Sequence, residues 1–514
     1  MAKPLTPFSI VAPGFYGLNL SDSPVGLSPN FALDATNCVI DKSGRIASRK
    51  GWTKAHTVNA DLGASDITCI GELIQNDGTA TTLATGGGFL FKHASTTLTT
   101  LTYGGGGVAP TISANNWQFC QLSGVGIFWQ RGYDPLIYDP AVSTTTFRRL
   151  NEKTGTLGTV PQCNTAISAY GRIWAADTST DKGTLAWSDL LTPHIWSGGT
   201  SGSLNLRQVW PIGGDEIVGL AAHNNFLFIF GRRQILIYSG ATTPSTMTLQ
   251  DTIVGIGCVA RDSIANTGED VWFLSDSGVR SMQRTIQEKS APFRNASKNV
   301  HDYLQNMANI ADKSTIKACY SAVNDFYLLR VPEVDQVLCF DTRLPLEDGS
   351  NRITIWTDIT PACFAETKSR KLYLGKAGYL SEYSGYLDDT STYRMQYYTS
   401  WIDFGNPIQK SILKKILLTV IGGTSQTITF KWAYDFMATY FSESASLPAL
   451  ASPEYNNNYE YNEGAEYGAN MSVNVLGVNG SSSGTVLQFG FETEINGRAL
   501  SVQKVDLFTK EGRL

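Results

Sequence analysis

Short apolar runs bounded by turns recur along most of the chain. Each run has four or five apolar or aromatic residues between turns that are often marked by glycine. Successive runs lie about 40 to 55 residues apart, which is the length of a four-stranded propeller blade. The clearest runs are GGGFLFKH around Phe89, GVGIFWQRG around Ile127, YGRIWAAD around Trp174, HNNFLFIFGRRQILIYSG around Phe226, GEDVWFLSDSGVRSM around Trp272, VNDFYLLRVP around Tyr327 and SRKLYLGKAGYLSEYSG around Tyr373.

Two of these runs also contain a hairpin signal. SDSGVRSM and GKAGYLSEY place Gly278 and Gly378 between strand-like segments, where a tight turn needs a positive φ. The pattern therefore predicts a six- or seven-bladed β-propeller-like body over residues 56–400. A pair of β-sandwiches is the alternative.

One segment inside this body has helical rather than strand spacing. In SKNVHDYLQNMANIAD, the apolar residues Val300, Leu304, Met307 and Ile310 fall on one helical face. Ser297 precedes them at a position where its hydroxyl could cap the first turn. We expect an amphipathic helix near 297–312, inserted between blades and used for packing.

The pattern changes at both ends of the chain. QTITFKWAYDF and TVLQFGFETEI alternate strictly, which predicts a β-sandwich-like domain over 401–514. Between them, the Tyr-, Asn- and Glu-rich segment 454–468 has no apolar period and should be an exposed loop, either a flexible acidic tip or a contact loop. Residues 1–55 are expected to form an extended N-terminal arm and first strands, with the proline-rich stretch 1–30 lying over a neighbouring subunit. The predicted fold class is all-β.

Composition narrows the functions that this fold could serve. The 514 residues include 40 Lys and Arg against 45 Asp and Glu, a net charge of −5. This balance argues against a DNA clamp, which needs a basic face. Apolar runs are too short for a membrane span, so no stable membrane insertion is expected. Eight scattered cysteines without a CxxC pair indicate reduced, mostly buried thiols.

Candidate chemistry is sparse. The five histidines are scattered, no nucleophile or phosphate-loop motif is complete, and no set of carboxylates is fixed by a motif. The stretch LAWSDLLTPHIWSG brings Ser188, Asp189 and His194 close in sequence, but a catalytic triad is defined by geometry. We therefore predict no catalytic residues, no metal and no cofactor.

The same stretch is better interpreted as part of a blade. Trp187 and Trp196 are expected to pack between sheets, as are Trp174 and Trp272 in other runs. Asp189 is placed to accept hydrogen bonds from the backbone of the turn before Pro193. With Gly278 and Gly378, these residues are the predicted blade and turn anchors.

Several sequence segments, in the same order along the chain, resemble segments of the tail nozzle proteins (tail tubular protein B or DNA-stabilisation proteins) of short-tailed bacteriophages, the podoviruses. LSPNFALDATNCVIDKSGRIASRKGW resembles their opening segment, with Asn37 closing a strand and Arg49 to Gly51 leading into the first blade. GRIWAAD…GTLAWSDLLTPHIWSGG and GCVARDSIANTGEDVWFLSDSGVRSM resemble successive blades. TSWIDFGNPIQKSILKKI resembles the exit from the propeller.

This resemblance implies a structural virion protein, not an enzyme. Such proteins form a homo-oligomeric ring, usually a hexamer, in the virion tail below the portal–adaptor connector, and they are assembled in the host cytoplasm. Their ring encloses a channel that retains genomic double-stranded DNA and passes it to the host without sequence-specific binding. They anchor a tail fibre or tailspike and, in some cases, a plug or needle protein. The alternatives are a carbohydrate-active or carbohydrate-binding propeller, either a glycosidase or a lectin-like host binder, and a cellular scaffold propeller, which the absence of WD or kelch signatures disfavours.

Overall fold

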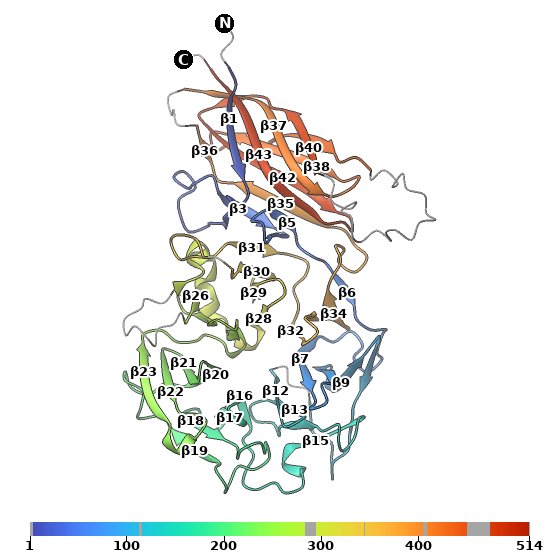
Figure 1. Ribbon diagram of the computed structural model, residues 1–514, viewed down its shortest axis with the longest axis vertical. Coiled ribbons are helices and arrows are strands. Elements are labelled where there is room, and N and C mark those ends of the chain that lie inside the picture. Colours follow the sequence, from blue (N-terminus) through green and yellow to red (C-terminus); the bar gives the residue numbers. More distant parts are fainter. Residues whose placement is uncertain are drawn as a thin grey trace.

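The chain folds into two β-domains stacked end to end (Figure 1). The computed structural model describes residues 4–112, 116–282, 294–343, 345–404, 409–449 and 473–512. The propeller domain is the ring of sheets in the lower part of Figure 1, and the sandwich domain, which contains both chain ends, lies above it. The segment 454–468, expected to be an exposed loop, lies outside the described residues.

Antiparallel sheets follow one another around the propeller domain. The first blade contains β7 (Ile67–Ile74), β8 (Ala80–Gly86), β9 (Phe89–Ala94) and β10 (Thr97–Thr100). The second contains β11 (Thr102–Tyr103), β12 (Gln118–Leu122), β13 (Val125–Trp129), β14 (Leu136–Tyr138) and β15 (Thr146–Arg149). The third contains β16 (Cys163–Ala169), β17 (Arg172–Thr178), β18 (Thr184–Trp187) and β19 (Gly202–Asn205).

The remaining sheets complete the ring. The fourth blade contains β20 (Ile217–His223), β21 (Phe226–Gly231), β22 (Gln234–Ser239) and β23 (Thr248–Val254). The fifth contains β24 (Ala265–Asn266), β25 (Val271–Ser275), β26 (Gly278–Ser281) and β27 (Arg294–Asn295). The next position holds β28 (Ala318–Ser321), β29 (Phe326–Val331), β30 (Gln336–Asp341) and β31 (Ile353–Trp356). The last blade holds β32 (Cys363–Glu366), β33 (Leu372–Lys376), β34 (Tyr379–Tyr383) and, from the N-terminal segment, β6 (Trp52–Lys54).

The six- or seven-bladed propeller predicted from the sequence is confirmed. Within the described residues, six blades are separate sheets, and β28–β31 occupy a seventh position while their sheet continues into the sandwich domain. The innermost strands contact one another in a closed ring, and β32 contacts β7 to complete it. Because β6 pairs with β34, the N-terminal segment also closes the last blade with a strand from the start of the chain.

The two faces of each inner sheet explain the apolar runs. Along β21, Leu227 and Ile229 point into the core shared with the third blade, and Phe228 and Phe230 point into the core shared with the fifth. Strand residues alternate between faces, so a sheet covered on both sides needs apolar residues at successive positions. The runs are therefore strands buried between neighbouring blades.

The sandwich domain combines strands from both ends of the chain. One sheet contains β1 (Thr6–Val11), β4 (Cys38–Ile40), β5 (Ile46–Ser48), β37 (Ser411–Gly422), β40 (Val473–Asn479), β41 (Ser483–Gly484) and β43 (Leu500–Glu511). The other contains β2 (Gly17–Leu18), β3 (Phe31–Thr36), β35 (Tyr393–Thr399), β36 (Ile402–Asp403), β38 (Thr427–Tyr434), β39 (Phe441–Ser446) and β42 (Val486–Ile495). Strand β31 joins this second sheet to the propeller, since it pairs with β30 on one side and with β2 and β3 on the other.

Two expectations for the N-terminal and helical segments are corrected. The arm was expected to lie over a neighbouring subunit, but β1 pairs with β43 of its own chain along six residues. The helix expected near 297–312 is reduced to α1 (His301–Leu304), flanked by the 3-10 helices η4 (Lys298–Val300) and η5 (Gln305–Asn309). Ser297 does not cap it; its hydroxyl accepts a hydrogen bond from the Val279 amide instead. The apolar face nevertheless packs into the core, because Val300, Leu304 and Met307 are buried.

The other short helices lie in connections. They are η1 (Leu150–Glu152), η2 (Pro244–Thr246), η3 (Arg261–Ser263) and η6 (Lys313–Thr315). In the part of the chain that the structure describes, no helix has both the length and the apolarity to cross a membrane. All eight cysteines are free thiols, and only Cys319 is not fully buried.

Candidate functional site

A charged network lies inside the ring of inner strands. Arg261, in η3, donates hydrogen bonds to Asn116 beside β12 and to Asn164 in β16, and it pairs with Asp262. Lys317, next to β28, also pairs with Asp262. Burial alone would raise the pKa of Asp262, but the two cations outweigh it and lower that pKa to about 2. The network thus ties inner strands of several blades together and leaves Asp262 ionised and fully engaged.

The predicted anchors of the third blade lie in its core or close its long loop. Trp174 and Trp187 are buried, with ring centroids 5.5 Å apart, and Trp196 packs edge-on against Trp129 of the second blade. Asp189 bonds the backbone of the turn before Pro193, as predicted: its carboxylate interacts with the Leu190 amide and its carbonyl accepts from the Thr192 amide at 3.3 Å. Its carboxylate also accepts from the amide and hydroxyl of Thr200, because the loop folds back to the blade there.

The other anchors lie in the fifth and last blades. The Trp272 ring packs at a tilt against Tyr327, with centroids 5.3 Å apart, and so joins the fifth blade to β29. Gly278 (φ 102°) and Gly378 (φ 75°) are in the β25–β26 and β33–β34 hairpins. A Cβ at Gly278 would lie 2.2 Å from the Ser297 hydroxyl, and one at Gly378 would lie 2.9 Å from a backbone carbonyl. Both positions therefore need glycine for conformation and for space.

Ser188 and His194 do not form a catalytic pair among the described residues. The buried Ser188 hydroxyl accepts from the Ile173 amide and donates to the Asp189 carbonyl. Burial lowers the pKa of His194, and the nearby Lys153 charge lowers it further. Its Nδ1 atom is buried without a hydrogen-bond partner in the described structure. The Ser188 hydroxyl therefore links the end of β18 to β17, and His194 does not act as a base toward it.

The junction between the two domains is held by Arg49, whose side chain is fully buried. Its guanidinium makes two hydrogen bonds, of 2.7 and 2.8 Å, to the carboxylate of Asp388, in the link between β34 and β35. It also donates to Asn37 and lies 4.0 Å above the ring of Tyr393. Asn37 (φ 54°) in turn bonds Thr357, which follows β31. This group of residues, the junction knot, joins the N-terminal segment, the propeller and the sandwich.

Gly51 shows how closely these segments approach. A Cβ at this position would lie only 1.8 Å from the carbonyl oxygen of Leu387, so no other residue fits without moving the backbone. Asn37, Arg49 and Gly51, which carry the N-terminal part of the sequence resemblance, therefore all lie at the point where the two domains meet.

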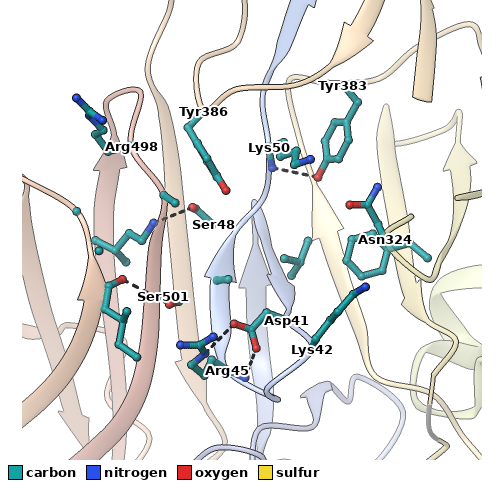
Figure 2. A pocket seen from close by; sticks show the side chains of 18 of the residues that line it. Asp41, Lys42, Arg45, Ser48, Lys50, Asn324, Tyr383, Tyr386, Arg498 and Ser501 are labelled. Atoms are coloured by element: carbon teal, nitrogen blue, oxygen red, sulfur yellow. Dashed lines mark hydrogen bonds and ion pairs between the residues drawn. The ribbon is translucent and has the colours of Figure 1, made fainter. Parts of the chain in front are cut away.

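A cleft of about 480 Å³ opens beside the junction knot (Figure 2). The β4–β5 hairpin, the end of the last blade and the sandwich turns at 421–423 and 497–501 form its walls. Five cationic side chains and one carboxylate line it: Lys42, Arg45, Lys50, Arg343, Arg498 and Asp41. The cleft is therefore basic in a protein whose net charge is negative.

Internal ion pairs neutralise only part of this charge. Arg45 pairs with Asp41 at 2.8 Å, Arg343 with Asp341 at 2.7 Å, and Lys42 with Asp325 at 3.8 Å. Lys50 and Arg498 have no ion-pair partner within the described ranges.

The remaining cleft groups offer hydrogen-bonding chemistry. The hydroxyl of Tyr383 accepts from the Lys50 amide at 3.0 Å, and burial raises the pKa of this phenol well above its usual value. In the described residues, no group of three or more His, Cys, Asp or Glu side chains could hold a metal ion. The cleft can hold an anionic group by charge and hydrogen bonding.

Sequence reasoning missed this cleft for a physical reason. Lys50 and Arg498, the cations without an ion-pair partner among the described residues, are separated by almost the whole chain. A local basic cluster such as FGRRQ gives no guide to the cleft, because Arg232 there pairs with Asp276. Only the pairing of terminal strands with one another brings the cleft residues together.

Comparison with known proteins gives only distant structural likeness. No family model matches the chain, and no curated protein matches it either. The Pan2 WD40 domain of Neurospora crassa aligns with 65% of this chain and 96% of its own, at 10% identity and a TM-score of 0.39. An exo-β-1,3-galactanase of Phanerochaete chrysosporium aligns with 79% and 98%, at 9% identity and a TM-score of 0.28. An auxiliary nutrient binding protein of Bacteroides thetaiotaomicron aligns with 65% and 76%, at 11% identity and a TM-score of 0.33. These values are too low to inform the activity of this chain.

Proposed function

We propose that this chain is a structural virion protein that forms the tail nozzle ring of a short-tailed bacteriophage. Six copies would form the ring below the portal–adaptor, enclose the channel that retains and passes genomic DNA, and anchor fibres or other tail parts. The junction knot is the observation that carries the proposal, because it fixes propeller and sandwich into one body. A channel wall needs that rigidity when DNA moves past it.

The charge distribution supports the same role. A net charge of −5 limits attraction between the protein and DNA phosphates, so DNA would pass without a strong hold. The basic cleft is the exception, and it is suited to an acidic surface of a neighbouring copy. Ring contacts are heterologous, so each copy brings together two different patches, and opposite charges favour that pairing. We assign the cleft to this contact.

A carbohydrate-active propeller is the alternative. The carboxylates inside the propeller ring give it little support. A glycosidase needs two carboxylates that reach a sugar from an open site. Asp262, the carboxylate of the inner network, is buried between Arg261 and Lys317. Asp177, a carboxylate on β17 of the third blade, is paired with Arg131.

Electron microscopy of the purified protein, alone and with a portal–adaptor complex, tests the proposal. We expect a six-fold ring with a central channel that docks coaxially on the complex. A monomer that stays monomeric with the complex and releases sugar from a glycan would overturn it.

The exposed Arg498 gives a sharper test of the ring contact. Arg498→Glu should weaken ring assembly about tenfold, because a contact between opposite charges becomes a repulsion. Lys368→Glu is the matched control, since this exposed lysine lies on the β32–β33 loop and does not line the cleft. Equal loss in both variants, measured by mass photometry, would remove the cleft from the interface.

A further inference from the structure

A second hollow, of about 500 Å³, lies on the outer face of the sandwich domain. Its residues come from three adjacent strands and two connections: Leu33 and Asp34 from β3, Gln396 and Tyr398 from β35, Gln488 and Glu492 from β42, with Trp401 and Tyr440 beside them. We call this set the sandwich groove. It shares no lining residue with the basic cleft.

The aromatic residues of the groove are held in fixed positions. Tyr398 pairs directly across the sheet with Gly490, and its ring lies so close that a Cβ at Gly490 would be 2.3 Å from it. A glycine at this central position lets the ring lie against the sheet backbone. The Tyr398 hydroxyl donates to Glu492, and its ring meets Tyr440 edge-on at 5.3 Å. One side of the ring is thus against the sheet and the phenol cannot rotate freely.

Trp401 extends this platform. Its ring centroid is 4.7 Å from that of Phe436, and the indole is only partly buried. Phe436 and Tyr440 are themselves exposed, at 51% and 38%. Large aromatic groups normally bury most of their surface, so a partly exposed cluster around a hollow points to a ligand.

Hydrogen bonds fix the orientation of the planar carboxylate and amide groups in the groove. Asp34 accepts from Thr36 and Gln396, both at 2.6 Å, and Gln488 donates to the Thr399 carbonyl at 2.8 Å while accepting from Tyr440. Burial raises the pKa of Asp34, and these hydrogen bonds only partly offset it. Each carboxylate and amide oxygen has more than one lone pair, so all can still accept from a ligand hydroxyl.

These features match the chemistry of a sugar. The faces of aromatic rings carry negative charge and attract the weakly positive C–H groups of a pyranose face. Fixed amide and carboxylate groups around the ring can bond the hydroxyls at its edge. The charged residues that line the groove are both acids, Asp34 and Glu492. Arg394 pairs with Glu492, so the remaining negative charge is that of Asp34, which disfavours anionic sugars. We propose that the sandwich groove binds a neutral oligosaccharide, with Tyr398 and Trp401 as its stacking platform.

The proposal does not depend on ring formation and can be tested with the protein in any oligomeric state. The probes are maltotetraose, cellotetraose, laminaritetraose and chitotetraose, with 3′-sialyllactose as the anionic comparison, measured by saturation-transfer NMR and then by calorimetry. At least one neutral tetrasaccharide should bind at millimolar concentration or below, and sialyllactose should bind at least tenfold more weakly.

Trp401→Ala should weaken binding about tenfold, a loss that corresponds to one aromatic stacking contact. Phe89→Ala is the matched control, because Phe89 is an exposed aromatic residue on β9 of the propeller and does not line the groove. Tyr398→Phe keeps the ring but loses its bond to Glu492, so it should weaken binding less than Trp401→Ala. The proposal is overturned if no neutral tetrasaccharide binds, if Trp401→Ala and Phe89→Ala behave alike, or if sialyllactose binds as well as the neutral sugars.

Discussion

Replacing Arg49 by methionine tests whether the junction knot couples the two domains. Methionine has similar length but no charge, so the Asp388 carboxylate, 9% exposed, would be left buried without its cation. Removing one partner of a buried pair costs about 3–5 kcal/mol. Loss of the cation contact with Tyr393 adds about 1 kcal/mol. We therefore expect Arg49→Met to lower the free energy of unfolding by about 4–6 kcal/mol.

That loss converts to a modest change in melting temperature. With an unfolding entropy of about 2.1 cal/mol/K per residue, the 514-residue chain loses about 1 °C per kcal/mol if both domains unfold together. Differential scanning calorimetry should show the melting temperature fall by about 4–6 °C, and the single transition should split because the domains lose one of their ties, another being strand β31. Limited proteolysis should then cut the link around Asp388.

Two comparisons make the result decisive. Lys371→Met breaks an exposed pair with Glu382 and should cost at most about 1 kcal/mol. Arg49→Met combined with Asp388→Leu should recover much of the loss, since no buried charge remains unpaired. The reasoning is refuted if Arg49→Met melts like the parent protein in one transition, or if the double variant is no more stable than the single one.

Two further predictions concern the propeller. Trp187→Ala removes a buried ring that packs on Trp174 and should lower the free energy of unfolding by about 3–5 kcal/mol, measured in urea. Ser188→Ala leaves the Ile173 amide unpaired and should lower it by about 1–3 kcal/mol. Equal losses in the two variants would contradict the assignment of Trp187 as a core residue. Because the pKa of Asp262 is held below its unfolded value of 3.8, its ionic contribution is complete above pH 4 and is lost as the pH falls toward 2. That contribution is about 2 kcal/mol. Between pH 5 and 2, the free energy of unfolding in urea should therefore change less with pH in Asp262→Asn than in the parent protein. Identical slopes in the two proteins would count against the ionised network.

The blades were predictable because their signal is local. Each run such as FLFIFG contains its own alternation between two cores and its own turn residues, so a window of a few residues is enough to identify a strand. The same locality explains why Trp174 and Trp272 could be placed in blade cores, since both lie inside such short apolar runs. The apolar face was predicted correctly, since Val300, Leu304 and Met307 are buried and Ile310 packs against the same core, but no capping bond extends the short helical turn.

The junction knot and the two hollows could not be predicted in the same way. Ser9 bonds Asp506 across 497 residues, and Thr53 bonds Ser384 across 331. No propensity or period in one segment specifies a partner at that distance. The sandwich groove depends on the register that places Tyr398 against Gly490, and register follows from the assembled sheet.

The distribution of terminal strands also determines when the chain can finish folding. Strand β6 needs β34 before the last blade is complete, and β1 needs β43, which ends one residue before the last described residue. Strands β1 and β6 must therefore wait for partners that are synthesised much later, and long-range pairing of this kind closes late. Arg49 lies between β5 and β6, so its buried pair with Asp388 forms only when both domains close around it. The basic cleft is built from the same segments. In the proposed ring, a contact surface that appears only after both domains have closed would keep incomplete chains out of the assembly.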